Sequence, residues 1–458
     1  MSPVMTRFRG DGLSARAMRS SAWTALGYGG SQALRLASNL ILTRLLFPEA
    51  FGLMALVSVF IVGLTMFSDM GTHPAILQHR RGDDPAFLNT AYTIQVVRGA
   101  VLWLASAAIA YPAALFYGQP QLALILPVAG FSLLLQGLEP TRVDTAARHL
   151  RLGRLTALDL ISQTVGLVFM VALAWATQSV WALVAGWIVS SGTRLALVRL
   201  ALPGPKSRLA WEPAAARDLL HFGFWLFLST ACGFLVAQGD KAILGKYLTL
   251  EQLGLYNIGF FLASFPMLLG QTIGGRILIP LYRERPPGAS AANFARLRQL
   301  RFGLTSLTLG MLTAMAFGGE WIVDLLYDPR YAAAGAILVL IAVVQIPSVI
   351  GMTYDQAALA AGDSRNYFLL TAARALFLVC GLIIGAEWLG LVGALVGQAL
   401  AAIAVYPLLI WLARRHGAWD AAHDLTFLLL GGLIAAGAIG VEHVAISELL
   451  TLFRGGVE

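Results

Sequence analysis

Apolar segments separated by short polar connections follow one another along almost the whole chain. Each is about 20 residues long, the length that an α-helix needs to cross the hydrocarbon core of a bilayer. The first half contains predicted spans near residues 21–45, 51–73, 87–111, 121–140, 155–177 and 180–200. The second half contains predicted spans near residues 218–246, 252–280, 298–319, 332–352, 367–386 and 389–412, with a further one near 425–442. The last apolar stretch, from Val444 to Phe453, is too short to cross alone.

A helix–loop–helix unit occurs twice in the chain. Leu42–Phe60 and Leu244–Leu262 match at a constant spacing of 202 residues, which places Gly52 on Gly254. Two further matches follow in the same order, Asp144, Ala146, Ala147 and Arg154 with Asp355, Ala357, Ala358 and Arg365, and Ala182–Val184 with Ala394–Val396. Internal repeats in a membrane chain are typical of transporters that bind their cargo between the halves. We therefore expect an all-α polytopic membrane protein with two six-helix lobes related by pseudo-twofold symmetry, followed by one or two C-terminal helices.

The repeat and the connections predict five segments. They are a cytoplasmic tail (1–20), an N-terminal lobe (21–200), a cytoplasmic linker (201–217), a C-terminal lobe (218–412) and a C-terminal extension (413–458). The composition agrees with a membrane protein, since 58% of the residues are hydrophobic and 12% are charged. Soluble domains carry about 25% charged residues, so the composition excludes that class.

Arginine and lysine gather in alternate connections and give the chain a net charge of +8. The positive-inside rule then places the amino terminus and the basic connections in the cytoplasm. The charge is a topology signal and not a sign of nucleic-acid binding; contact with lipid headgroups is a second use that it leaves open. The basic groups include Arg80 and Arg81, Arg142, Arg148, Arg151 and Arg154, and Arg199, Lys206 and Arg208.

The connections offer no place for a catalytic domain. The predicted outward loops are short, and the sequence contains no phosphate-binding loop, HExxH motif or paired acidic motif on a soluble loop. The two cysteines, Cys232 and Cys380, fall within predicted spans of different halves, where we expect ordinary packing and no metal site. We therefore do not expect an enzyme.

Polar side chains inside the spans are costly in hydrocarbon and are candidates for function. Gln32, Arg35 and Asn39 have the spacing i, i+3, i+7, so they share one face of the first span. The other candidates are spread over both halves: Asp69, Arg98, Asp240, Lys241, Gln271, Arg276 and Arg374. Some have simpler explanations. Asp240 and Lys241 could form a structural ion pair or a helix-end cap, Arg98 and Arg374 could extend to the membrane surface, and Arg276 could mark only the orientation of its span.

If these side chains meet between the lobes, they form a cationic cavity. Guanidinium groups pair bidentately with phosphate, so such a cavity suits an anionic headgroup such as a diphosphate. Asp69 and Asp240 are candidates for binding a coupling ion, Na⁺ or H⁺, because a buried carboxylate shifts its pKa readily. We expect no other cofactor. Asp159 and Arg194 lie nearer span ends and are expected to be structural.

Several motifs in order resemble those of a known family. They are Leu219–Gly223, within an HFGFWL motif, Val180–Val184, and the run from Gln238 to Pro266 that contains GDKAILGKYL. Over about residues 20–415 the chain resembles the Wzx-type oligosaccharide flippases of the multidrug/oligosaccharidyl-lipid/polysaccharide exporter superfamily.

The resemblance implies a two-lobed bundle of six plus six helices. It also implies alternating access that moves an undecaprenyl-diphosphate-linked oligosaccharide across the bacterial inner membrane, with a polysaccharide polymerase or assembly machinery as a partner. Relatives that flip the peptidoglycan lipid precursor carry cavity arginines on the first, second and eighth spans, to which Arg35 and Arg276 would correspond. The second span departs from that pattern, because it offers Asp69 and no arginine before Arg80.

Two other functions are compatible with parts of the sequence. A cation-coupled drug or metabolite antiporter would use the same scaffold, although an anionic or aromatic cavity would then be expected. A membrane enzyme of polysaccharide assembly would need a large outward loop, which this chain lacks. The charge of the candidate cavity favours the flippase.

Overall fold

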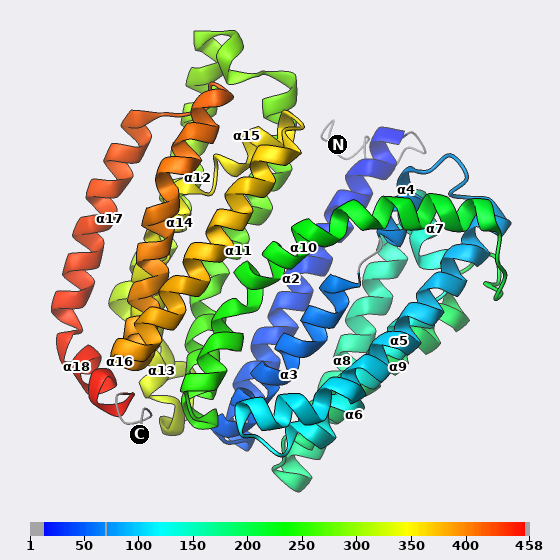
Figure 1. Ribbon diagram of the computed structural model, residues 1–458, viewed down its shortest axis with the longest axis horizontal. Coiled ribbons are helices and arrows are strands. Elements are labelled where there is room, and N and C mark those ends of the chain that lie inside the picture. The colour runs from blue at the N-terminus through cyan, green and yellow to red at the C-terminus, as the bar shows by residue number, and fades with distance from the viewer. Residues whose placement is uncertain (1–12, 69–70, 454–458) are drawn as a thin grey trace, which may run out of the picture. The chain divides into compact units, whose positions relative to one another are not determined.

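The computed structural model describes residues 13–68 and 71–453, and it leaves out the side chains of residues 13–21, 25 and 220–229. The described part of the first half is built from α2 (Leu13–Leu45), α3 (Pro48–Phe67), α4 (Thr72–Gln78), α5 (Pro85–Tyr117), α6 (Leu122–Gly137), α7 (Arg142–Arg148), α8 (Leu152–Thr177) and α9 (Trp181–Ala201) (Figure 1). The second half begins with α10 (Pro213–Tyr247), α11 (Leu250–Glu284), η1 (Pro287–Ala289), α12 (Ala291–Leu326) and η2 (Pro329–Tyr331). It ends with α13 (Ala333–Val344), α14 (Ile346–Gly351), α15 (Asp355–Ala360), α16 (Ser364–Arg415), α17 (Ala421–Val441) and α18 (His443–Leu452).

Every predicted span falls on a helix, and the described residues contain no strand, so the expected all-α membrane fold is confirmed. Nine helical segments in the described chain are long and apolar enough to cross a bilayer, or ten if the pair α6–α7, bent by 59°, counts as one span. α2 and α10 are not among them, and these two helices carry half of the predicted site residues. α16 contains two predicted spans, which meet at a break where Gly390 has φ 60°.

The chain packs as two units. Unit 1 comprises Met1–Leu46 and Val57–Ala231, and unit 2 comprises Phe47–Leu56 and Cys232–Glu458. The change of unit therefore lies inside α10, after the predicted linker 201–217. The first turns of α3 belong to unit 2 and the rest of that helix belongs to unit 1, so α3 and α10 each connect the units covalently.

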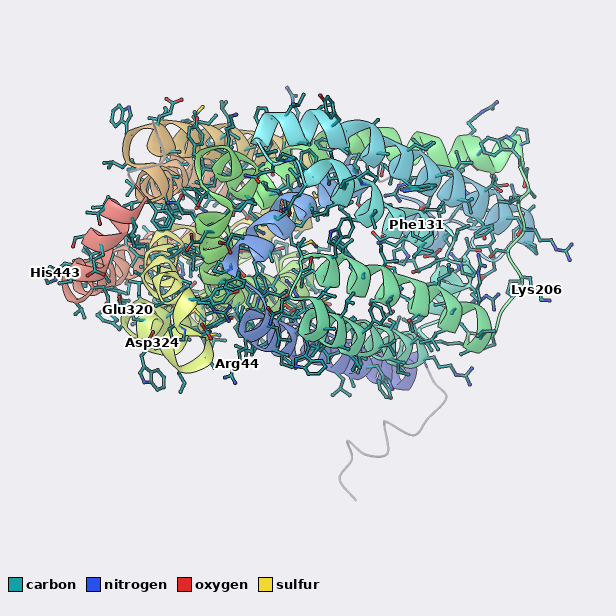
Figure 2. All side chains as sticks on the ribbon, turned by 90° about the horizontal axis from the view of Figure 1, so that it is seen from below. Arg44, Phe131, Lys206, Glu320, Asp324 and His443 are labelled. Carbon is teal, nitrogen blue, oxygen red and sulfur yellow. The ribbon has the colours of Figure 1, made fainter. Side chains whose placement is uncertain are left out.

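The linker is fixed to unit 1 along α5. The hydroxyl of Thr93 donates to the carbonyl of Ala210 at 2.8 Å and accepts from its amide at 3.0 Å. Arg81 donates to both carboxylate oxygens of Glu212, at 2.9 and 2.7 Å, and also pairs with Asp84. Hydrogen bonds from Arg81 hold the pKa of both carboxyls, Glu212 and Asp84, below their usual range. Lys206 lies on this connection at the edge of unit 1 (Figure 2).

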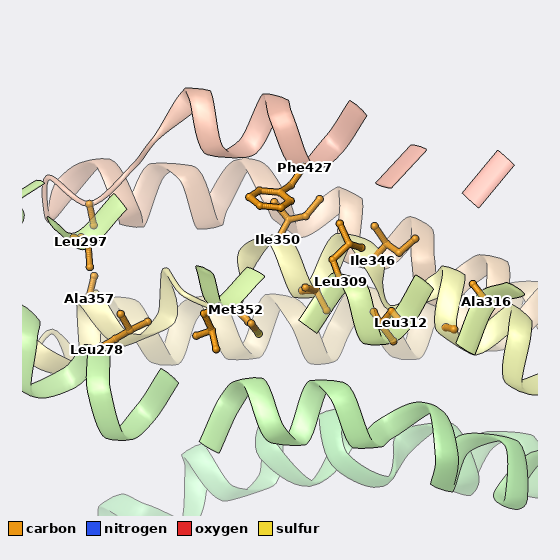
Figure 3. Close-up of a cluster of buried hydrophobic side chains, with 14 of the residues drawn as sticks. Leu278, Leu297, Leu309, Leu312, Ala316, Ile346, Ile350, Met352, Ala357 and Phe427 are labelled. Atoms are coloured by element: carbon orange, nitrogen blue, oxygen red, sulfur yellow. The ribbon is translucent and has the colours of Figure 1, made fainter. Parts of the chain in front are cut away.

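Unit 2 has a continuous apolar core around α12, α13 and α14 (Figure 3). The segment Ala333–Gly351 is the most enclosed of the candidate spans, since 78% of its most apolar window is buried inside the protein. Leu309, Leu312 and Ile350 are at most 2% exposed, and α17 adds Phe427 to the same cluster. Helices α12 and α17 run side by side, so the thirteenth span packs onto the second lobe (Figure 1).

The starts of α3 and α11, both within unit 2, pack together through the repeated glycines. A Cβ added at Gly52 would lie 1.9 Å from the carbonyl oxygen of Leu250, and one added at Gly254 would lie 1.9 Å from that of Pro48. Pro48 and Leu250 are themselves repeat partners, so the contact is reciprocal. Only a residue without a side chain permits this approach, which explains why both halves carry glycine at this position.

Replacing Gly52 or Gly254 with alanine should force the two helices apart, because the added Cβ has no free space. Overpacking of this kind costs about 1–3 kcal/mol, so each variant should melt at a lower temperature than the wild type in detergent. Gly275→Ala in α11 is the matched control, since a Cβ there meets no atom within 4 Å. Unchanged melting temperatures for both variants would contradict this packing.

Candidate functional site

A cavity of about 500 Å³ lies within unit 2. Four helices and the α13–α14 junction supply its charged and amide groups: Asp240 from α10, Gln271 from α11, Gln345 from the junction, Asp355 from α15, and Arg374 and Gln398 from α16. The rest of the wall is mainly apolar and includes Phe260 and Met267. A mostly apolar pocket with a few convergent polar groups is the usual form of a binding site.

Asp240 is the least satisfied charged group of this cavity. Asp240 is only 5% exposed, and one of its carboxylate oxygens accepts a hydrogen bond of 2.6 Å from the hydroxyl of the fully buried Tyr256. The other oxygen, Oδ1, is buried without a hydrogen-bond partner, as is the amide oxygen of Gln398. An unpaired buried carboxylate oxygen is costly, so Asp240 is a candidate cation site.

Lys241 does not neutralise Asp240. Its ammonium nitrogen lies 4.8 Å from the centroid of the Phe260 ring, a cation–π distance, and the described residues contain no ion pair between the two neighbours. The simpler explanation of Asp240 and Lys241 as a structural ion pair therefore does not apply.

Arg374 forms a two-pronged ion pair with Asp355. Two guanidinium nitrogens donate to two carboxylate oxygens, each at 2.8 Å, and the side chains are 29% and 19% exposed. Arg374 therefore does not extend to the membrane surface. Because this pair cancels, the formal charge of the cavity within unit 2 is that of Asp240 alone, so this cavity is not the cationic one predicted for a diphosphate.

Arg98 has a structural partner in unit 1. It donates to the carbonyl of Thr65 at 3.0 Å and to the hydroxyl of Ser68 at 2.9 Å, both at the C-terminal end of α3. A cation is favourable at that end of a helix, where carbonyl groups lack partners within the helix. Arg98 therefore fixes the end of α3, and Asp69, the next predicted residue, lies outside the described residues.

The stripe on α2 is preserved in the structure. Arg35 is exposed and donates to Gln32 at 3.3 Å, while Gln32 and Asn39 are half-buried. α2 packs on α8, where Ser31 donates to Gln163 at 2.8 Å. On α11, Arg276 is exposed and does not line the unit 2 cavity.

The structure thus brings three predicted residues, Asp240, Gln271 and Arg374, into one cavity of unit 2. Asp355 and Gln398 also line this cavity but were not among the site residues predicted from the sequence, although Asp355 belongs to the repeat match with Asp144. In unit 1, Arg194 joins Asp159 at 2.7 Å and Glu139 at 2.8 Å. Arg194, Asp159 and Glu139 form an ion cluster that joins α8, α9 and the break between α6 and α7.

A family model described as "Polysaccharide biosynthesis protein" matches residues 41–336. The chain belongs to this family. The match covers more than half of the chain, and it confirms the family that the sequence motifs predicted.

Named relatives agree with that assignment. The chain is 24% identical over 316 residues to the succinoglycan biosynthesis transport protein ExoT of Rhizobium meliloti, and the match covers 66% of this chain and 63% of ExoT. It is 20% identical over 401 residues to the lipopolysaccharide biosynthesis protein WzxC of Escherichia coli, covering 85% of this chain and 79% of WzxC.

Solved structures identify the fold. An inward-facing multidrug resistance MATE transporter of the MOP superfamily aligns with a TM-score of 0.65 at 14% identity, covering 84% of this chain and 95% of that one. The lipid II flippase MurJ aligns with a TM-score of 0.64 at 13% identity, covering 94% of this chain and 99% of that one. This polysaccharide biosynthesis family member therefore has the MOP transporter fold and is a multi-pass membrane protein.

Removing one member of the Asp355–Arg374 pair should destabilise the protein, because the other charge loses its partner. Such a loss costs about 3–5 kcal/mol when the pair is fully buried; since both side chains are partly exposed, we expect about 1–3 kcal/mol for Asp355→Asn or Arg374→Gln. The free energy of unfolding can be measured by SDS titration.

The double variant Asp355→Asn/Arg374→Gln should recover part of that loss, because no charge is left alone. Arg283→Gln, an exposed arginine on α11, is the control. Single variants no less stable than this control would show that the ion pair contributes nothing to the fold.

Proposed function

We propose that this protein is a flippase that moves a polyprenyl-diphosphate-linked oligosaccharide, the repeat unit of a surface polysaccharide, across the bacterial inner membrane by alternating access. The family assignment over residues 41–336 is the observation that carries the proposal. The likeness to ExoT, a transport protein, supports transport, and the likeness to MurJ, a lipid II flippase, supports a lipid-linked cargo.

The architecture supports transport rather than catalysis. Among the described helices, the longest connection runs from Leu202 to Glu212, and its backbone is bound to unit 1. A connection of this size cannot house an active site of the kind that a polymerase or ligase needs. We therefore propose that the protein is not an enzyme, and that a separate polysaccharide polymerase or assembly machinery takes over the flipped product.

The chemistry of the cargo explains why a protein is needed. Sugar hydroxyls and a diphosphate would lose their water in hydrocarbon, at a cost of several kcal/mol for each unsatisfied group. A polyprenyl tail has no such penalty and can stay in the lipid. The protein therefore needs to shield only the headgroup.

The exposed arginines are the best candidates for the diphosphate. Arg98 and Arg374 are part-buried and bind the end of α3 and Asp355, whereas the side chains of Arg35, which also contacts Gln32, and Arg276 are exposed on their own units. We assign headgroup binding to Arg35 in unit 1 and Arg276 in unit 2, with Gln32 and Asn39 of α2, and Lys241 and Gln271 of unit 2, as further polar candidates. Guanidinium groups suit this role because they stay charged and bind phosphate through two hydrogen bonds.

We assign the coupling ion to Asp240. Its unpartnered oxygen, its near-complete burial and the orphan amide oxygen of Gln398 in the same cavity are features of a site that accepts Na⁺ or H⁺. Asp69 is retained as a second candidate. The alternating basic connections support a cytoplasmic amino terminus.

A cation-coupled drug or metabolite antiporter is the second candidate function. The observation that favours it is the anionic charge of the unit 2 cavity, together with the likeness to a multidrug MATE transporter. The family assignment decides for the flippase.

Arg35→Gln and Arg276→Gln should each reduce export of the surface glycan. A charge-assisted hydrogen bond contributes about 1.5–3 kcal/mol, which corresponds to a loss of about 10- to 100-fold in binding. Complementation of a deletion strain, with the surface glycan quantified, measures the effect. Arg283→Gln, two turns beyond Arg276 on the same helix, should leave export unchanged.

Drug tolerance of the same strains separates the two functions. The flippase predicts that tolerance stays constant while glycan export falls. Intact export in both arginine variants would refute the headgroup assignment, and lost drug tolerance with intact export would favour the antiporter.

A further inference from the structure

A second pocket, of about 560 Å³, lies at the basic end of unit 1, beside the starts of α5 and α8 and the end of α9. Its charged and titratable lining consists of Asp83, His149, Arg151 and Arg154. The apolar lining includes Leu88, Ala146, Leu202 and Pro203. The proposed transport function does not use this pocket.

The acidic groups at this end of unit 1 already have partners. Asp83 accepts from Arg148 at 3.1 Å and contacts His149 at 2.9 Å. Asp144 contacts His73 at 2.6 Å, Arg81 binds Asp84 and Glu212, and Asp218 lies 3.7 Å from His79. These carboxylates therefore do not neutralise the positive charge of the arginines that line the pocket.

Arg151 and Arg154 supply that excess charge. Both side chains are exposed and line the pocket, and neither has an acidic partner in the described part of the chain. The one carboxylate of the pocket, Asp83, already pairs with Arg148, so the two guanidinium groups leave the pocket with an excess of positive charge that attracts an anion. Phosphate suits such a pair, because each guanidinium can donate two parallel hydrogen bonds to it.

The repeat offers an internal comparison. Helix α16 is the counterpart of α8, and its N-cap Asp363 accepts from the backbone of Asn366 and pairs with His416 at 3.1 Å. These donors hold the pKa of Asp363 below its usual range, the Asn366 side chain having the largest effect. In unit 1 the N-cap of α8 is Arg151, which makes no capping hydrogen bond. The start of α16 in the second lobe thus has a carboxylate, whereas the start of α8 in the first lobe has Arg151 and an open, basic pocket.

The surroundings of the pocket indicate the depth at which it lies in the bilayer. Gly153, which lines the pocket, packs against the indole of Trp23, since a Cβ added there would lie 2.9 Å from its ring nitrogen. The Trp23 side chain is 45% exposed. Tryptophan is enriched at the level of the lipid headgroups, and the apolar lining next to the arginines matches the glycerol and upper acyl region of a lipid.

We propose that this pocket binds the phosphate group of an anionic membrane lipid through Arg151 and Arg154. The lipid phosphate then lies beside the start of α8, which lacks a carboxylate cap like that of Asp363 at the start of α16. A bound lipid would fix the junction of α5, α8 and the linker, and it is distinct from the transported cargo.

Native mass spectrometry of the full-length protein, released from nanodiscs of phosphatidylglycerol and phosphatidylcholine, tests this inference by counting the anionic lipids retained. The variant Arg151→Gln/Arg154→Gln should retain one phosphatidylglycerol fewer than the wild type. Each basic residue near the surface contributes about 1 kcal/mol to anionic lipid binding, so the apparent affinity of that lipid should fall roughly 30-fold. Arg365→Gln, the repeat counterpart of Arg154, should retain the wild-type number.

Two further arms distinguish the source of the phosphate and the fold of the variant. Inorganic pyrophosphate, added in a thermal-shift assay, should raise the melting temperature of the wild type and of the double variant equally. If it stabilised the wild type but not the variant, the pocket would bind a soluble phosphate instead. Circular dichroism should show equal helicity in both proteins. An unchanged lipid count in the double variant, or an equal loss in Arg365→Gln, would overturn the proposal.

Discussion

The absence of hydrogen-bonding partners in hydrocarbon is the constraint on which this structure depends. Backbone amides and carbonyls must pair within the chain, and a bundle of helices satisfies that requirement span by span. Polar side chains inside the bundle obey the same rule. Arg98 binds the end of α3, Arg374 binds Asp355, and Arg194 binds Asp159 and Glu139. These groups stabilise the fold and are therefore poorly suited to move a ligand.

Asp240 is the exception that gives the protein a candidate site. Tyr256 satisfies one of its oxygens, and the second has no partner although the residue is almost fully buried. Under the proposed coupling role, a cation bound at this carboxylate would act on the contact between α10 and α11 that the Asp240–Tyr256 hydrogen bond makes. Because α10 also connects the two units, an event at Asp240 acts on a helix that both units share.

The sequence predicts the fold well because the fold follows from span length and hydropathy. The repeated glycines also mark a contact in the structure, since Gly52 packs against the carbonyl of Leu250 and Gly254 packs against that of Pro48 within unit 2. The cost of polar groups in spans marked Asp240, Gln271 and Arg374 as candidates, and the structure places all three at the cavity of unit 2. The Asp355–Arg374 pair could not be predicted, because it depends on the rotation of α16 against a short helix that hydropathy does not register. For the same reason the sequence does not show that the cavity within unit 2 carries the formal charge of Asp240 alone.

Transport in proteoliposomes tests the central claim most directly. A defined polyprenyl-diphosphate-linked oligosaccharide is reconstituted with the wild type, with Asp240→Asn, and with Asp324→Asn, an exposed carboxylate outside the cavity. The flippase proposal predicts that the wild type and Asp324→Asn move the lipid at a rate that responds to a Na⁺ or H⁺ gradient. Asp240→Asn should lose that response. Failure of the wild type to move the lipid, or a full gradient response in Asp240→Asn, would contradict it.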